Sequence, residues 1–270
     1  MSVLEEGLYD LGRLDRLSYN DTPVHRLDPR AKVFTTLVFL VCVVSFGSYD
    51  LVPMIPFVIF PVALIAVADL PAGFLLRKLL AVAPFAVFVG IFNPLLDREV
   101  IIQIGGLGIS GGWVSYASIL ARFFLTTIAA LVLIATTSFS GVCLGLRRMG
   151  LPDVLVTQLL LLYRYIFVLG GETMRMARAR ALRSFGRRGM GLGVYVQILG
   201  QLLLRTYARA QRIYQAMLAR AFDGEVRLAT SLHFGIRDAV FVLGWSAAFV
   251  VFRLVNVPVT LGAIVMGAMR

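Results

Sequence analysis

Two arginines, each flanked by alanines, are the residues of this chain best suited to bind a partner protein. They occur as Ala179-Arg180-Ala181 and Ala219-Arg220-Ala221, forty residues apart. The planar guanidinium of arginine pairs with a carboxylate through two parallel hydrogen bonds, whereas a lysine ammonium acts as a point charge. Small neighbours allow a helix to approach a partner closely while the arginine reaches into a groove. The pattern therefore predicts ion pairing with carboxylates of another protein.

Further arginines surround both motifs at helical spacing. With successive residues placed about 100° apart, one face of the first stretch carries Glu172, Arg175, Arg180, Arg183 and Arg187. Arg178 falls on the apolar side instead. Ala177-Arg178-Ala179 also fits the first motif, but the forty-residue spacing and the polar-face position favour Arg180. In the second stretch, a stripe is formed by Arg205, Arg209, Arg212 and Arg220. We regard three of these as additional candidates for partner contact: Arg178, Arg183 and Arg212.

One interpretation of the arginine stripe needs no protein partner: a solvated helix face, or side chains that extend to anionic lipid. Lysine serves a lipid headgroup nearly as well as arginine, yet the region 145–237 contains fifteen arginines and no lysine. That preference favours a protein partner. Nucleic acid is not expected as a partner, because no motif interleaves aromatic and basic residues.

Signatures of enzymatic chemistry are absent from the sequence. The two lysines, Lys32 and Lys78, are followed by valine and leucine, so there is no Walker A motif and the chain is not itself a P-loop ATPase. There is no HExxH motif, and the predicted spans contain neither a GxSxG motif nor paired carboxylates. Both histidines, His25 and His233, lie outside the apolar runs. We therefore expect no catalytic residue, no metal site and no cofactor in this chain.

Composition places these arginines in a membrane protein. Of the 270 residues 59% are hydrophobic and only 15% are charged, whereas a soluble domain is about half apolar and a quarter charged. The expected fold is an all-α membrane protein with about five transmembrane helices. Apolar runs predict these helices at 33–46, 51–68, 79–96, 113–139 and 238–256. The first begins upstream, with Asp28 as N-cap and Pro29 in the first turn.

The connecting segments complete this interpretation. Residues 97–112 are expected to form a glycine-rich loop, Asn93 and Pro94 a helix-end turn, and residues 259–269 a short apolar tail. Cys42 and Cys143 form no CxxC motif and are interpreted as buried small hydrophobic residues. Residues 1–30 are polar and do not resemble a signal peptide.

Basic residues occur in every second segment between the predicted spans. They precede the first span, recur at Arg77 and Lys78, and crowd the region 145–237, which predicts that these segments and the N-terminus face the cytoplasm. The chain then divides into a cytoplasmic segment at 1–30, transmembrane helices at 31–140, an arginine-rich region at 141–235, and a final transmembrane helix with a tail at 236–270.

The arginine-rich region is predicted to contain two long helices, at about 153–187 and 191–222, separated by Gly186 to Gly193. Their first halves are expected to be buried and their second halves cytoplasmic. Arg122, Arg164 and Arg253 are polar residues within apolar runs. Arg122 and Arg164 offer weak support for a self-contained secondary transporter, which would need ionisable groups at a midplane cavity.

The paired motifs, together with residues 14–33 (LDRLSYNDTPVHRLDPRAKV), resemble the EcfT/CbiQ family of transmembrane coupling components in energy-coupling-factor transporters. The resemblance runs from about Leu14 to the last span. It implies an all-helical subunit that joins a substrate-binding membrane subunit to two cytoplasmic ABC-type ATPases, which bind the ATP. It also implies that Arg180 and Arg220 each sit in a groove of one ATPase. Ala181 and Ala221 stand where many members have glycine, a change expected to be tolerated on a helix.

The N-terminal segment looks most like the cobalt-type CbiQ members, which implies uptake of Co²⁺ across a bacterial inner membrane. A component dedicated to nickel or to a vitamin is the nearest alternative.

Overall fold

The computed structural model describes residues 3–47, 49–96, 100–104, 107–183, 191–224, 226 and 234–255. The chain divides into two compact units. One unit combines Met1–Leu14 with Leu146–Ser231, and the other combines Asp15–Gly145 with Leu232–Arg270. The segment boundaries at 30, 140 and 235 that the sequence suggested stay a prediction.

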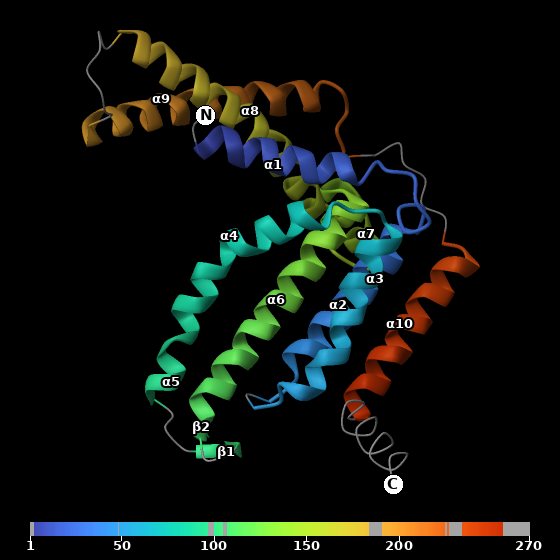
Figure 1. Ribbon diagram of the computed structural model, residues 1–270. Helices are drawn as coiled ribbons and strands as arrows, with labels where there is room; N and C mark the ends of the chain where they lie inside the picture. The colour runs from blue at the N-terminus through green and yellow to red at the C-terminus, as the bar shows by residue number, and fades with distance from the viewer. Residues whose placement is uncertain are drawn as a thin grey trace. The chain divides into compact units, whose positions relative to one another are not determined.

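The larger unit is a helical bundle, in which α6 packs on α2 and α4, and α10 packs on the other side of α2 (Figure 1). Its elements in chain order are α2 (Pro29–Val44), the 3-10 helix η1 (Val52–Val58), α3 (Ile59–Val67), α4 (Ala72–Gly90), α5 (Phe92–Leu96), β1 (Val100–Ile104), β2 (Leu107–Ser110), α6 (Gly111–Thr137), α7 (Phe139–Arg148) and α10 (Ile236–Leu254).

Helix α2 begins where the sequence predicted. The Asp28 carboxylate accepts a hydrogen bond from the Arg30 backbone N–H at 2.8 Å, and Pro29 occupies the first turn, where a missing N–H costs nothing. The third predicted run, 79–96, starts too late. Helix α4 already begins at Ala72 and continues through Pro84 to Gly90, since Arg77 and Lys78 lie within its first turns rather than before them.

Three of the described helices are long and apolar enough to cross a membrane, at Ala72–Pro94, Gly111–Thr137 and Asp153–Arg183. The segment Val52–Val67 is apolar but shorter. Helix α6, with 27 residues, is about 40 Å long, more than the ~30 Å of a bilayer's hydrocarbon core. The predicted all-α membrane fold is confirmed, with one small exception.

That exception is a β-hairpin within the predicted glycine-rich loop 97–112. Strands β1 and β2 pair antiparallel, with Ile102 opposite Ile109 and Ile104 opposite Leu107. The run Val-Ile-Ile in β1 has the β-branched composition typical of strands, and the glycines around it obscured this signal.

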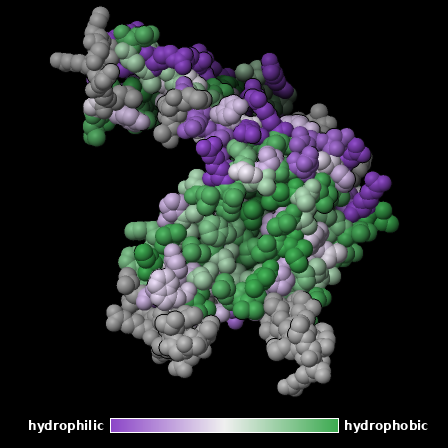
Figure 2. Space-filling model, viewed as in Figure 1, coloured by the Kyte–Doolittle hydropathy of each residue, from purple (hydrophilic) through white to green (hydrophobic). Residues whose placement is uncertain are grey.

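Aromatic side chains form the core of the bundle. Phe39, Phe57, Phe60 and Phe249 are at most 1% exposed, and the Phe39 and Phe60 rings lie 4.9 Å apart. The outside of the bundle is apolar as well: Phe85 is 68% exposed, and Figure 2 shows hydrophobic residues over most of this unit's visible face. A soluble protein rarely exposes so large an apolar surface, whereas a bilayer accommodates it.

The smaller unit contains α1 (Val3–Leu17, whose last residues belong to the bundle unit), α8 (Asp153–Arg183) and α9 (Leu192–Leu218). Helices α8 and α9 pack against each other. The protein itself does not bury their first halves: α8 buries only Val156 and Thr157, and α9 buries no residue. Contact with lipid is left for the first half of α8, which lies in a helix long and apolar enough to cross a membrane. Arg187, His233, residues 259–269 and most of the break after α8 lie outside the described residues.

Candidate functional site

The first arginine motif lies at the end of a long helix. Ala179, Arg180 and Ala181 occupy the last turns of α8, which the structure follows to Arg183. The last carbonyl groups of a helix carry partial negative charge, so Arg180 and Arg183 stabilise this end. Arginines at a helix terminus are also well placed to reach beyond the helix.

Helices α8 and α9 enclose a basic groove of about 550 Å³. The face of α8 that the sequence predicted to be polar lines this groove, together with polar residues of α9. Its polar lining consists of Glu172, Arg175, Arg180, Arg183, Gln197, Gln201 and Arg205. A neighbouring cavity of about 370 Å³ is lined by Glu172, Arg205, Arg209 and Arg212, among others.

Glu172 is the single carboxylate in the lining of both cavities. Its oxygens accept hydrogen bonds from Arg175 at 2.7 Å and from Arg205 of α9 at 3.0 Å. One carboxylate therefore links the two helices and neutralises one positive charge. Within the described part of the chain, Arg180 and Arg183 have no carboxylate partner, so the groove keeps an excess of positive charge.

Arg178 has a partner within the chain. Its Nη2 lies 3.6 Å from Oε1 of Glu5 in α1, and the guanidinium remains largely exposed. The side of α8 that looked apolar in the sequence is thus the side on which α1 supplies a carboxylate. This contact was not predicted, because residues 1–30 were interpreted only as a polar segment.

The second motif lies at the end of α9, and here the expectation of a continuous helix to residue 222 is wrong. Helix α9 ends at Leu218, and Ala221 adopts the left-handed conformation with φ 55°. The Phe222 N–H donates to the Met217 carbonyl and the Ala221 N–H to the Leu218 carbonyl, each at 3.0 Å. These two bonds define a Schellman turn, whose left-handed position favours glycine.

The turn reverses the expected effect of alanine at position 221. Alanine at this position is strained by about 1–2 kcal/mol, so glycine suits it better than alanine, contrary to the expectation from helix propensity. Arg220 immediately precedes the left-handed residue, in the turn that ends the helix. It has no ion pair with any residue that the structure describes.

A polar network that the sequence analysis missed joins three helices of the bundle. Asp238 of α10 accepts a hydrogen bond from the Asp28 backbone N–H at 2.7 Å, and Lys32 of α2 donates to the Thr136 carbonyl of α6 at 2.8 Å. All four residues are nearly buried. The charged LDPRAK run directly before an apolar segment was the available signal, because charges next to the core need partners.

Three of the remaining polar candidates within the apolar runs make local structural contacts. Arg122 donates to Ser118 at 3.0 Å and to the Gly47 carbonyl, and Arg253 lies 4.3 Å from the Phe46 ring. Asn93 donates to Ser115 at 2.9 Å. In the ranges that the structure describes, no group of three or more His, Cys, Asp or Glu side chains could hold a metal ion. Cys143 is buried, as expected, whereas Cys42 is part-exposed.

Comparison with known proteins places these features in a family. The family model CbiQ, described as a cobalt transport protein, matches residues 20–232. The cobalt transport protein CbiQ of Rhodobacter capsulatus is 31% identical over 70% of this chain and 80% of its own length. The energy-coupling factor transporter transmembrane protein EcfT of Heliobacterium modesticaldum is 27% identical over 87% of this chain and 93% of its own. The nickel permease LarQ of Lactiplantibacillus plantarum is 29% identical over 44% of this chain and 42% of its own.

Proposed function

Because the chain belongs to the CbiQ family of membrane transport components, we propose that it is the transmembrane coupling subunit of an energy-coupling-factor importer for Co²⁺. In this proposal two cytoplasmic ABC-type ATPases bind ATP, and a separate membrane subunit binds the substrate. The chain itself holds no ATP and catalyses no reaction. It lies in a bacterial cytoplasmic membrane, with its N-terminus and the arginine-rich region on the cytoplasmic side.

One observation carries the proposal: each of two long helices ends in an alanine-flanked arginine that lacks a partner among the described residues. Arg220 is exposed at the end of α9, and Arg180 is part-exposed in the last turn of α8. A guanidinium without an internal carboxylate is free to form bidentate pairs with acidic residues of an ATPase groove. Each motif would then dock into one ATPase, with Ala179 and Ala181, and Ala219 and Ala221, allowing close approach.

The other residues of the stripe have supporting roles. Arg183 lies in the same groove as Arg180, and Arg212 lines the neighbouring cavity. Both are additional candidates for contact with an ATPase. Arg178 is a weaker candidate, because Glu5 already lies beside it.

An exposed apolar stripe on α9 supports docking to the substrate-binding subunit. Its members recur every three or four residues and are each at least half exposed: Leu192, Tyr195, Val196, Leu199 and Leu203. Helix α9 therefore has a basic face and an exposed apolar face, and each can contact a different partner. We infer that ATP-driven closure of the ATPases moves the arginine ends of both helices, and that the apolar face of α9 passes this motion to the substrate subunit.

The substrate assignment rests on relatives. The family description and the Rhodobacter protein's name both refer to cobalt, which favours Co²⁺. Nickel is the alternative favoured by the likeness to a nickel permease, and a vitamin remains a further one. A secondary transporter is disfavoured, because Arg122 and Arg253 are taken up by structural contacts rather than facing a midplane site.

A pull-down of the membrane-embedded chain from its native host tests the coupling role. The intact chain should bring down an ABC-type ATPase. Arg180→Glu and Arg220→Glu should each weaken that association, by roughly 2–5 kcal/mol if the new pair is buried, and the double variant should lose it.

Arg77→Glu is the matched control, since Arg77 is exposed and lies on α4 in the bundle. It should retain the ATPase. If no ATPase comes down with the intact chain, or if the double variant retains as much as the control, the coupling proposal is refuted. Uptake of radioactive cobalt, with nickel as competitor, then assigns the substrate.

A further inference from the structure

The bundle contains a cavity of its own, which is lined by α3, α10 and residues just before α2. Its volume is about 730 Å³. Apolar side chains form its walls: Ala63, Leu64, Val67, Val240, Phe241 and Trp245. Two arginines, Arg26 and Arg237, lie in the same lining. An apolar cavity with cationic groups at one end fits a molecule with a hydrocarbon chain and an anionic head.

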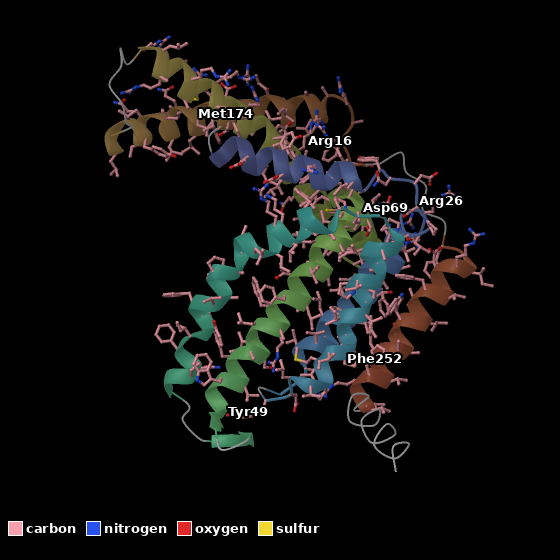
Figure 3. All side chains as sticks on the ribbon, in the orientation of Figure 1. Arg16, Arg26, Tyr49, Asp69, Met174 and Phe252 are labelled. Carbon is pink, nitrogen blue, oxygen red and sulfur yellow. The ribbon has the colours of Figure 1, made fainter. Side chains whose placement is uncertain are left out.

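The arginines lie at one end of this cavity because of where their elements begin. Arg26 precedes α2, and Arg237 is in the first turn of α10. Figure 3 shows Arg26 at the same end of the bundle as Asp69, with Tyr49 and Phe252 at the opposite end. The wall of α10 from Ile236 to Trp245 is about 14 Å long, close to half of a ~30 Å hydrocarbon core. The cavity thus matches the depth of one leaflet.

The charged groups at the cavity sum to zero, but one guanidinium is not taken up by a neighbouring carboxylate. The Asp21 carboxylate is taken by Arg26, whose Nε and Nη2 donate at 2.6 and 2.7 Å. The Asp238 carboxylate is taken by two backbone N–H groups, of Asp28 at 2.7 Å and of Gly235 at 2.8 Å. Arg237, in contrast, has no ion pair with any described residue. Its guanidinium is left to bind an incoming phosphate, and Arg26 keeps further N–H groups for the same phosphate.

From this combination we propose that the cavity between α3 and α10 binds an anionic phospholipid. The phosphate lies between Arg26 and Arg237, and one acyl chain covers the apolar wall. This lipid shields side chains that the chain itself leaves bare, such as Val240, which is 67% exposed. The site is independent of the arginines that the coupling proposal uses.

Trp245 is a built-in reporter for this site. It lines the cavity and packs edge-on against Phe60, with ring centroids 5.0 Å apart. The chain has two tryptophans, so Trp113→Phe leaves Trp245 as the single source of indole fluorescence. A brominated acyl chain that enters the cavity will quench it. The experiment titrates the purified, full-length Trp113→Phe protein in detergent micelles with brominated phosphatidylglycerol or brominated phosphatidylcholine.

We expect saturable quenching at a lower concentration of the glycerol lipid than of the choline lipid. Arg237→Gln should raise the half-quenching concentration of the glycerol lipid about fivefold, the worth of one exposed charge pair. Ala63→Phe, which fills the wall, should reduce the maximal quenching. Arg77→Gln, outside the cavity, should leave the curve unchanged.

Equal quenching by both lipids, with no effect of Arg237→Gln, would mean that only ordinary boundary lipid reaches Trp245, and the proposal would be overturned. Arg26→Gln is a second test of the phosphate site should Arg237→Gln fail to fold, as judged by circular dichroism. An unchanged preference for the glycerol lipid in the Arg26→Gln variant would then overturn the proposal equally.

Discussion

Removing the Asp238 carboxylate should be among the most destabilising single changes in the bundle. The side chain is 6% exposed and accepts two backbone hydrogen bonds, from Asp28 at 2.7 Å and from Gly235 at 2.8 Å. A hydrogen bond to a charged group contributes about 1.5–3 kcal/mol, and an unsatisfied buried donor retains its desolvation cost. Asp238→Ala should therefore lower the free energy of unfolding by about 3–6 kcal/mol, twice the value of one such bond.

Asp238→Asn tests the two hydrogen bonds separately, because it removes only one of them. The amide keeps one acceptor oxygen and replaces the other with an NH₂ group, which cannot accept. It should cost about half as much as alanine. Unfolding by sodium dodecyl sulfate in mixed micelles, followed by the fluorescence of Trp245 on the same helix, gives the free energies. The neighbouring Arg237→Gln is the control, since Arg237 is exposed and unpaired among the described residues. A loss of less than about 1 kcal/mol in the free energy of unfolding is typical of a surface substitution. Such a small loss in both Asp238 variants would refute the idea that the polar network stabilises the bundle.

Two further predictions concern a helix end and a histidine. Ala221→Gly should stabilise the end of α9 by roughly 0.5–1 kcal/mol, since it relieves left-handed strain but adds unfolded-state entropy. Hydrogen exchange should therefore slow at the Phe222 N–H. Faster exchange would contradict the Schellman assignment. Burial and the Lys32 ammonium lower the pKa of His25 below its usual 6.5. The unfolded chain then binds a proton more readily, so stability is full above about pH 6.5 and should fall as the pH drops through the lowered pKa. His25→Gln should flatten this slope in the same unfolding assay, and an unaltered slope would assign it to other groups.

Local signals in the sequence predicted helix positions well where a single physical rule decides them. Asp28 and Pro29 predicted the start of α2 because capping acts within one turn. The arginine face of α8 followed from helical periodicity alone, and the structure turns that face toward α9.

Features that depend on distant residues could not be predicted in this way. The contact of Arg178 with Glu5 joins positions 173 residues apart in sequence (178 − 5 = 173). Asp238 and Asp28 are 210 residues apart. The end of α9 was misplaced for a different reason: alanine is a strong helix former, and only the surrounding turn forces Ala221 out of the helix.

The covalent path between the two units has a mechanical consequence. The chain passes from one unit to the other at three places, between Leu14 and Asp15, between Gly145 and Leu146, and between Ser231 and Leu232. The first two lie inside continuous helices, α1 and α7. A helix resists bending and twisting far more than a loop of the same length. At these two places the backbone that joins the units is therefore helical rather than an irregular loop.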